Sequence, residues 1–380
     1  MMDFSLSEEG KALRDTAKQF TEKEIIPVAA EYDRNGTFPH DVYKKAHKVG
    51  LMNFAIPDKY GGIGLTVLNA TVVIEELARG CAGITTSLLA NDMANYPIIL
   101  FGTDEQKERI LTEYTKELIY GSFSLTEPEA GSDVVGIKTA VKKDGDYYII
   151  SGEKCFTTNA NYSKYITVFA TMDRSMGHKG ICCFVVPKNS EGVTVGKKED
   201  KMGQRASDTA SVKFTDVKVS KNNLIGGEGN GFKVAMATLD HSRPNVAIAA
   251  VGIARAAMEH SIAYSLERKQ FGQPIAQFQA IQFMLANMAI EIESARLLTL
   301  KAAWLLDQKV RCTKESSFAK CFAADVAMRA TTDAVQIFGG YGYSKEYPVE
   351  KLMRDAKLMQ IYEGTAQVQR LVIAREILNS

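Results

Sequence analysis

The sequence lacks the motifs of several common nucleotide-binding and hydrolytic enzymes. Its 380 residues contain no G-x-G-x-x-G, the glycine pattern of a dinucleotide-binding βαβ unit, and no G-x-x-x-x-G-K-[ST] phosphate loop. The H-E-x-x-H zinc motif and the G-x-S-x-G nucleophile motif are also absent. These absences argue against a Rossmann enzyme, a P-loop NTPase, a zinc protease of this type and an α/β-hydrolase.

Metal-binding residues are few and scattered. The six cysteines form no C-x-x-C pair, and the five histidines show no ligand spacing, so the sequence predicts no metal site. We interpret the cysteines as buried, reduced thiols, which is typical of a cytoplasmic protein.

A large net charge and long apolar runs are also missing. A net charge of +1 gives no basic surface for nucleic acid, and no apolar run approaches the ~20 residues of a membrane span. The N-terminus has no basic region followed by an apolar stretch, so we expect no signal peptide. We therefore expect a cytoplasmic protein without a nucleic-acid or membrane partner.

What the sequence does have is a change of hydrophobic period along the chain. Residues 1–118 look helical, and Thr103 with Gln106 predicts a capping box. Residues 119–222 contain short β-branched and aromatic runs separated by glycines, which favours an antiparallel β domain. Residues 223–380 carry long amphipathic stripes, typical of a helical bundle. The predicted class is α+β, with a β domain between two helical domains.

Four segments, in order, resemble the acyl-CoA dehydrogenase family, especially its medium- and short-chain members. They are L-T-E-P-E-A-G-S-D at 125–133, R-K-Q-F-G at 268–272, Q-I-F-G-G at 336–340 and Y-E-G-T at 362–365. Each motif alone is weak, but the ordered set is specific. The resemblance implies a helical domain, a β domain and a C-terminal four-helix bundle, in a homotetramer that binds FAD and acyl-CoA.

The resemblance also implies roles for single residues. Predicted contacts to the flavin half of FAD or the thioester are Phe123, Leu125, Thr126, Ser132, Phe156, Thr158, Thr365 and Gln367. Predicted contacts to the other half of FAD, from a neighbouring subunit, are Arg268, Phe271, Gln336 and Gly340. Predicted substrate contacts are Ser132, Asp240, Arg243, Tyr362 and Gly364. Phe156 stands where many relatives have Trp.

The implied reaction removes a proton from the α-carbon of a thioester and a hydride from its β-carbon. No side chain accepts a hydride, so an organic cofactor is needed, and the resemblance makes it FAD. Glu363 is the predicted base, and a desolvated site would raise its pKa toward neutrality. Electrons would pass to electron-transfer flavoprotein. The alternatives are an acyl-CoA oxidase and a non-catalytic acyl-CoA-binding relative.

Asp92 departs from the family pattern. It lies in the segment that lines the acyl pocket of relatives, where a small neutral residue is usual. If Asp92 faces the pocket, it could serve as a second base and favour an alicyclic acyl-CoA over a short- or medium-chain one. Alternatively, Asp92 caps or flanks a helix turn and faces water.

Overall fold

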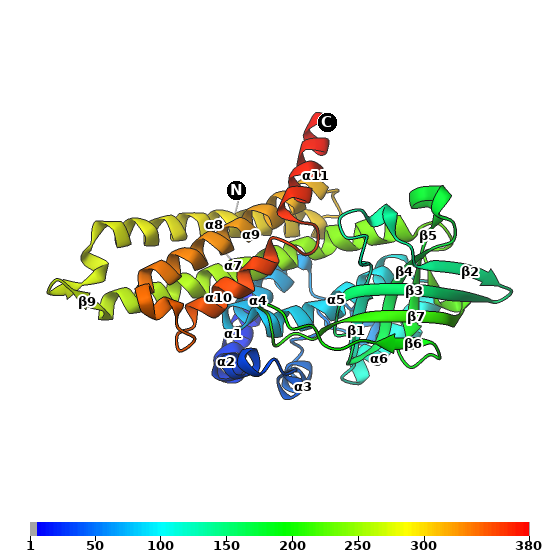
Figure 1. Cartoon of the computed structure of the whole chain (residues 1–380), viewed down its shortest axis with the longest axis horizontal. Coiled ribbons are helices and arrows are strands. Elements are labelled where there is room, and N and C mark those ends of the chain that lie inside the picture. The colour runs from blue at the N-terminus through cyan, green and yellow to red at the C-terminus, as the bar shows by residue number, and fades with distance from the viewer. Residues whose placement is uncertain (1–5, 380) are drawn as a thin grey trace.

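The computed structural model describes residues 6–379, and Figure 1 shows a helical block, a sheet and a long helical bundle in succession. The main helices of the first block are α1 (Glu8–Phe20), α2 (Ile26–Asn35), α3 (His40–Lys48), α4 (Val67–Gly80), α5 (Ala82–Phe101) and α6 (Asp104–Lys116). The predicted capping box of α6 is confirmed, because Thr103 and Gln106 each bind the other's backbone N–H. The α+β class is confirmed as well.

The middle of the chain forms one main sheet. Its strands are β1 (Tyr120–Ser124), β2 (Ala140–Asp144), β3 (Tyr147–Thr158), β4 (Ser163–Thr171), β5 (Ile181–Pro187), β6 (Val193–Val195), β7 (Thr209–Ser220) and β8 (Leu224–Ile225). Most neighbours are antiparallel, as predicted. However, β4 pairs in parallel with β1 along its length and with β2 at one position, so the sheet is mixed. A long loop carries the chain back after β1, and this connection permits the parallel pairing.

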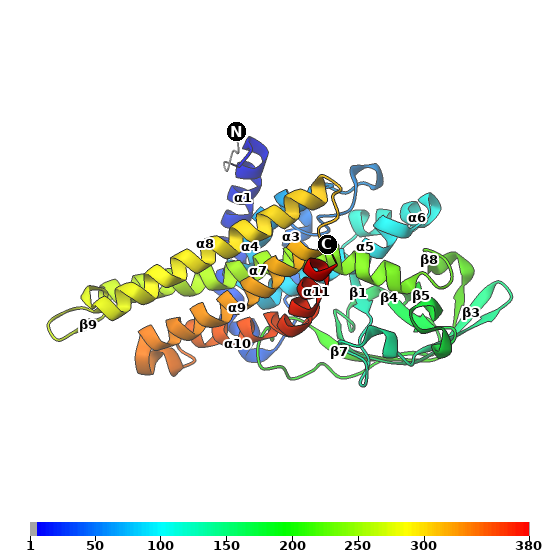
Figure 2. The same ribbon diagram turned by 90° about the horizontal axis from the view of Figure 1, so that it is seen from above.

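The last block is built from α7 (Gly231–Glu267), α8 (Gln279–Asp307), α9 (Thr313–Phe338), α10 (Val349–Met359) and α11 (Ala366–Leu378). The first four pack together as a bundle, and α11 packs on α9 (Figure 2). By length and composition α7 could cross a membrane, but 67% of its apolar window is buried inside the protein. It is therefore the central helix of the bundle, covered by α4, α8, α9 and α10.

A hairpin of β9 (Lys269–Gln270) and β10 (Gln273–Pro274) links α7 to α8. Figure 1 places it at the tip of the bundle, at the opposite end of the molecule from the main sheet. This arrangement separates the two groups of residues predicted to bind FAD.

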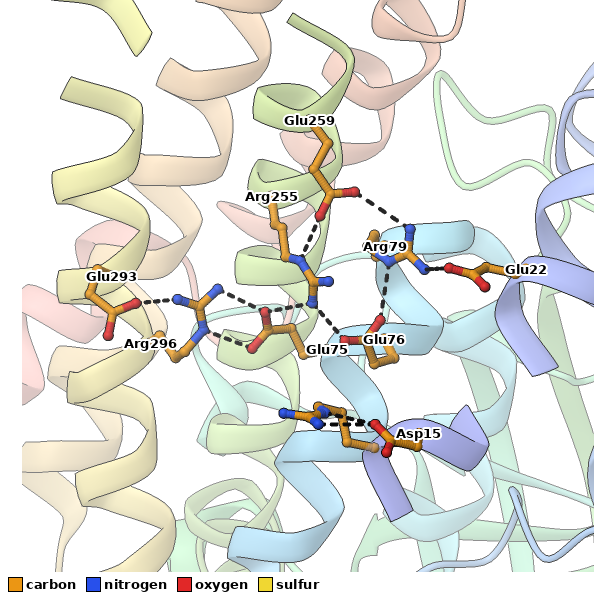
Figure 3. Close-up of polar contacts among 10 residues, drawn as sticks. Asp15, Glu22, Glu75, Glu76, Arg79, Arg255, Glu259, Glu293 and Arg296 are labelled. Atoms are coloured by element: carbon orange, nitrogen blue, oxygen red, sulfur yellow. Dashed lines mark hydrogen bonds and ion pairs between the residues drawn. The ribbon is translucent and has the colours of Figure 1, made fainter. Parts of the chain in front are cut away.

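A cluster of ion pairs joins α4 to the bundle (Figure 3). Glu75 receives two bonds from the Arg296 guanidinium, at 2.9 and 2.8 Å, and Glu76 receives one from Arg255 at 2.7 Å. Arg79 also donates to Glu76, at 3.1 Å. Glu75 and Glu76 are only 9% and 3% exposed, so each buried carboxylate depends on these guanidinium groups.

Candidate active site

A cavity of about 280 Å³ lies where α5, the sheet, α7 and the segment before α11 meet. Ten of the predicted site residues line it: Phe123, Leu125, Thr126, Ser132, Phe156, Thr158, Arg243, Tyr362, Glu363 and Gly364. Thr86, Leu89, Ala90 and Met93 of α5 form another wall. A larger cleft of about 730 Å³, between α2 and α10, contains none of the predicted residues. The smaller cavity is therefore the candidate site.

Glu363 lies in the short segment between α10 and α11. Its φ is +54°, and Gly364 follows at +85°, so two successive residues have left-handed backbone. This backbone conformation is unfavourable for a residue other than glycine, and such strain is common at functional sites. Gln369 of α11 donates to the carbonyls of Glu363 and Gly364, at 3.0 and 3.3 Å. Among the described residues, the N–H of Glu363 has no hydrogen-bond acceptor, so it is available to a ligand.

The pKa of the Glu363 carboxyl group is subject to opposing effects. Burial is the main effect, and it raises the pKa above the ordinary value. The Ser242 hydroxyl donates to Oε2 at 2.6 Å and lowers the pKa in part. The positive charges of Lys320 and Arg243 act in the same direction as Ser242. The result is a carboxyl group more basic than one in water.

The loop after β1 is anchored to the sheet by a buried ion pair. The Glu127 carboxylate accepts the N–H groups of Lys138 and Thr139, at 2.6 and 3.0 Å, and the Lys154 ammonium at 2.8 Å. Lys154 also donates to the Leu125 carbonyl, and burial lowers the pKa of Lys154 to about 8. Because its base is anchored in this way, the loop presents Thr126 to the cavity.

Phe156 is directed outward by an irregularity in β3. The register between β3 and β7 shifts between Lys154 and Thr157, and Phe156 itself has a φ of +53°. Bulges of this kind often redirect a side chain near an active site. The ring is 66% exposed, although it lines the cavity. An exposed aromatic face at this position suits stacking against a flat, aromatic ligand.

The polar groups of the cavity are also free to bind a ligand. The hydroxyls of Thr126, Ser132 and Thr158 make no hydrogen bond with any described residue. Arg243 is 5% exposed, and its Nε has no partner in the part of the chain that the structure describes. A flat ring with hydrogen-bonding edges fits these donors and Phe156, so the residues are compatible with the flavin ring of FAD.

Other predicted cofactor residues lie at the far tip of the bundle. Arg268 and Gly340 line a separate cavity of about 470 Å³, together with Tyr341. The Arg268 guanidinium lies 5.5 Å from the centre of the Tyr341 ring, and Phe271 is 94% exposed. Gln336 is also exposed near the end of α9. The two halves of the predicted FAD site are therefore apart in one chain, because Figure 1 places β9 at the tip of the bundle, far from α5, β1 and α11, which contribute to the main cavity.

The remaining predicted residues do not line the main cavity. Asp240 pairs with Arg243 at 2.6 Å and accepts from Thr313 at 2.9 Å. The Thr365 hydroxyl caps α11 by accepting from the N–H of Val368, and Gln367 is exposed on the same helix. Asp240 can still orient Arg243, whereas nothing in one chain connects Gln367 to the cavity.

The structure corrects the expectation for Asp92. This residue is 1% exposed in the middle of α5, so it neither faces water nor flanks a turn. It is not among the residues that line the cavity, which Ala90 and Met93 of the same helix reach instead. Its Oδ1 accepts the Ala55 N–H at 3.1 Å, and Oδ2 has no partner among the described residues. Asp92 thus lies on a different face of α5 from the cavity wall.

Sequence reasoning missed three residues that hold the Glu363 segment: Ser242, Lys320 and Gln369. One signal was available for Lys320. It lies on a helix stripe otherwise made of small residues such as Ser316 and Ala323, all of them buried. A lysine in such a stripe is unusual and indicates a specific partner.

Comparison with protein families gives three matches in sequence order. Residues 7–117 match the acyl-CoA dehydrogenase N-terminal domain, residues 122–217 the middle domain and residues 229–378 the C-terminal domain. The short-chain specific mitochondrial acyl-CoA dehydrogenase of Bos taurus is 44% identical over 99% of this chain and 91% of its own length.

Two solved structures are similar over nearly their whole length. One is butyryl-CoA dehydrogenase from Megasphaera elsdenii, with a TM-score of 0.97 and 43% identity, covering 99% of this chain and 100% of the other. The second is a chain in a structure described as the electron transferring flavoprotein of Acidaminococcus fermentans. Its TM-score is 0.98, with 45% identity and full coverage of both chains.

Proposed function

The chain belongs to the acyl-CoA dehydrogenase family and is an oxidoreductase that dehydrogenates acyl-CoA. From this premise we propose that Glu363 is the catalytic base and that FAD is the cofactor. The observation that carries the proposal is the position of Glu363. Its carboxyl group stands at the wall of a cavity that also exposes the Phe156 ring and the Thr126 hydroxyl. The base, an aromatic platform and free hydrogen-bond donors therefore meet in one place.

Glu363 performs the proton transfer. Burial makes its carboxylate more basic than an exposed one, while Ser242 fixes one oxygen and leaves the other for the α-proton. The free N–H of Glu363 donates to the thioester oxygen and stabilises the negative charge that develops there. When bound, FAD supplies an acceptor for the hydride that leaves the β-carbon.

FAD would be held by two copies of the chain. Phe156, Thr158 and Thr126 of one copy would contact the flavin, whereas Arg268 and Phe271 of another would contact the diphosphate and adenine half. The support is the separation of these two groups in one chain, since they line two different cavities, and β9 at the bundle tip is far from α5 and β1 (Figure 1). Phe271 and Gly340 are exposed, as expected for residues that complete a site on a neighbour.

A stripe of exposed apolar side chains on α8 supports association of copies. Phe283, Ile290, Leu297 and Trp304 recur every seven residues and are 60, 65, 43 and 51% exposed. Seven residues make almost two turns, so these side chains share one face of the helix. Exposed apolar patches of this kind mark protein–protein contacts, and we propose the homotetramer that the family resemblance implies.

The substrate is proposed to be a short-chain acyl-CoA. The α5 wall of the cavity is apolar at Leu89, Ala90 and Met93, which suits an alkyl chain. Two of the relatives above are a short-chain and a butyryl-CoA dehydrogenase. Because Asp92 is outside the cavity lining, it gives no support to an alicyclic substrate.

The proposed electron acceptor is electron-transfer flavoprotein. The similar chain in a structure described by that name supports this choice over oxygen. Anaerobic mixing with acyl-CoA, followed by admission of air or addition of electron-transfer flavoprotein, separates a dehydrogenase from an oxidase. An oxidase would be reoxidised rapidly by air alone.

The proposal is tested with Glu363→Gln, which keeps the shape and hydrogen-bonding capacity of the side chain but removes the base. Turnover of butyryl-CoA should fall by ~10²–10⁴-fold, while FAD and acyl-CoA binding persist. Octanoyl-CoA and cyclohexanecarboxyl-CoA complete the substrate panel. Near-normal turnover by the variant would reject Glu363 as the base. Wild-type flavin that no acyl-CoA can bleach would instead favour a non-catalytic binding protein.

A further inference from the structure

Lys320 is a fully buried lysine next to the proposed base. It lies on α9, is 0% exposed and donates to the Gly364 carbonyl at 2.6 Å. No carboxylate of the described residues lies within ion-pair distance of its ammonium group. Burial lowers the pKa of Lys320 to about 8, and the negative charge of Glu363 opposes that effect. An unpaired buried ammonium is costly, so its retention needs a specific reason.

The segment that Lys320 contacts is strained and clamped from two sides. Glu363 and Gly364 both have positive φ, a conformation that is unfavourable at Glu363 and must be supported by its surroundings. Lys320 holds the Gly364 carbonyl from α9, and Gln369 holds the same carbonyl from α11. In this conformation the N–H of Glu363 has no acceptor among the described residues. The two clamps therefore support the conformation that the chemistry requires.

The charged and titratable groups around Glu363 come from several elements. Tyr96 of α5 and Tyr362 beside Glu363 are neutral phenols whose pKa burial raises further. Arg243 of α7 is paired with Asp240, so part of its charge is already balanced. Further groups affect the pKa values of these neighbours: Asp92 of α5, Asp307 of α8, Cys321 and Asp325 of α9, Asp355 of α10 and Arg375 of α11. Lys320 is the buried cation in this set without a carboxylate partner.

Building on the proposed function, we propose that Lys320 is a positioning residue: it holds the Glu363 segment through the Gly364 carbonyl and places a positive charge near the Glu363 carboxylate. It does not touch the substrate, since it is absent from the cavity lining. Lys320 thus serves the proton transfer through Glu363. Gln369 shares the fixing role but contributes no charge, which makes the two effects separable.

The test compares Lys320→Met with Gln369→Leu. Both variants remove a donor to the Gly364 carbonyl, but only the first removes a positive charge. For both we expect kcat to fall tenfold or more with little change in KM. Only Lys320→Met should move the acid limb of the kcat/KM profile to higher pH, by about one unit or more, the effect typical of losing a nearby opposite charge. Lys320→Gln, which keeps an amide donor but removes the charge, should move the acid limb in the same direction and provides the test if Lys320→Met does not fold.

A second readout does not require turnover. The infrared band of the protonated Glu363 carboxyl group, identified by its loss in Glu363→Gln, can be titrated in each variant. The band should persist to higher pH in Lys320→Met than in wild type or Gln369→Leu. An unmoved band and an unmoved acid limb in both Lys320 variants would overturn the role of Lys320. If wild type does not dehydrogenate acyl-CoA, the proposed function fails, but the infrared titration still decides the effect of Lys320 on Glu363.

Discussion

Replacing Asp92 with asparagine should stabilise the protein above pH 7 and change little near pH 4. The carboxyl group is 1% exposed and accepts one hydrogen bond, from Ala55, while its second oxygen has no partner in residues 6–379. Burial therefore raises the pKa of Asp92 to about 7, despite the opposing bonds from the backbone of Ala55 and Phe54.

The sign and size of the effect follow from this pKa. Between pH 4 and 7 the folded protein binds a proton that the unfolded chain has released, so wild-type stability falls as the pH rises through this range. The gap between about 7 and the ordinary 3.8 corresponds to about 4 kcal/mol, an upper value for one fully buried group. Asparagine is neutral at every pH and can still accept the Ala55 N–H. The unfolding free energy of Asp92→Asn should therefore not fall in this way as the pH rises from about 4 to about 7.

The measurement is urea unfolding of wild type and Asp92→Asn at several pH values from 4.5 to 8.5, at one protein concentration. The difference in unfolding free energy should grow with pH and level off above about pH 7. Asp41→Asn, on the exposed face of α3, is the control for removal of a surface carboxylate. A constant difference across the pH range, or a variant less stable at pH 8, would refute the assignment of a protonated, buried Asp92.

Two further predictions concern packing between elements. Arg255→Met should lower the unfolding free energy by about 3–5 kcal/mol, because Glu76 is 3% exposed and loses one of its two guanidinium partners. Adding Glu76→Gln should recover part of that loss in urea unfolding, and purely additive losses would show that the pair is not coupled. Ile290→Glu, on the α8 stripe, should give smaller assemblies that lose FAD during gel filtration. Val49→Glu, a similarly exposed apolar site at the end of α3, should not, and a monomer that retains FAD would contradict a cofactor held between subunits.

The fold was largely accessible from the sequence because its signals are local. The capping box at Thr103, the glycine-separated strands and the stripe through Met288 and Ile292 each depend on neighbours within a few turns or strands. The parallel pairing of β1 with β4 was not accessible. Both strands have the composition of ordinary short strands, and their relative direction depends on the loop after β1 together with the β2–β3 hairpin, which lie between them in the chain.

The candidate site was accessible only in part, for a similar reason. Motif residues such as Thr126 and Tyr362 do line one cavity. The groups that govern Glu363 are distant in sequence: Ser242 is 121 residues away, and Lys320 is 44 residues from Gly364. Asp92 shows another limit. Because α5 is buried along most of its length, the hydrophobic period cannot tell which of its faces borders the cavity.

Because the groups that govern Glu363 are distant from it in sequence, the basicity of Glu363 can be changed without changing the motif around it. Burial raises the pKa of the Glu363 carboxyl group, whereas a direct ion pair with a cation would lower it and make the carboxylate a weaker base. Ser242 and Arg243 from α7 and Lys320 from α9 oppose the burial without forming an ion pair with Glu363. The basicity of the residue is therefore a property of how α7, α9 and α11 pack. A substitution that shifts α9 should alter the proton transfer even where every residue of the Y-E-G-T segment is retained.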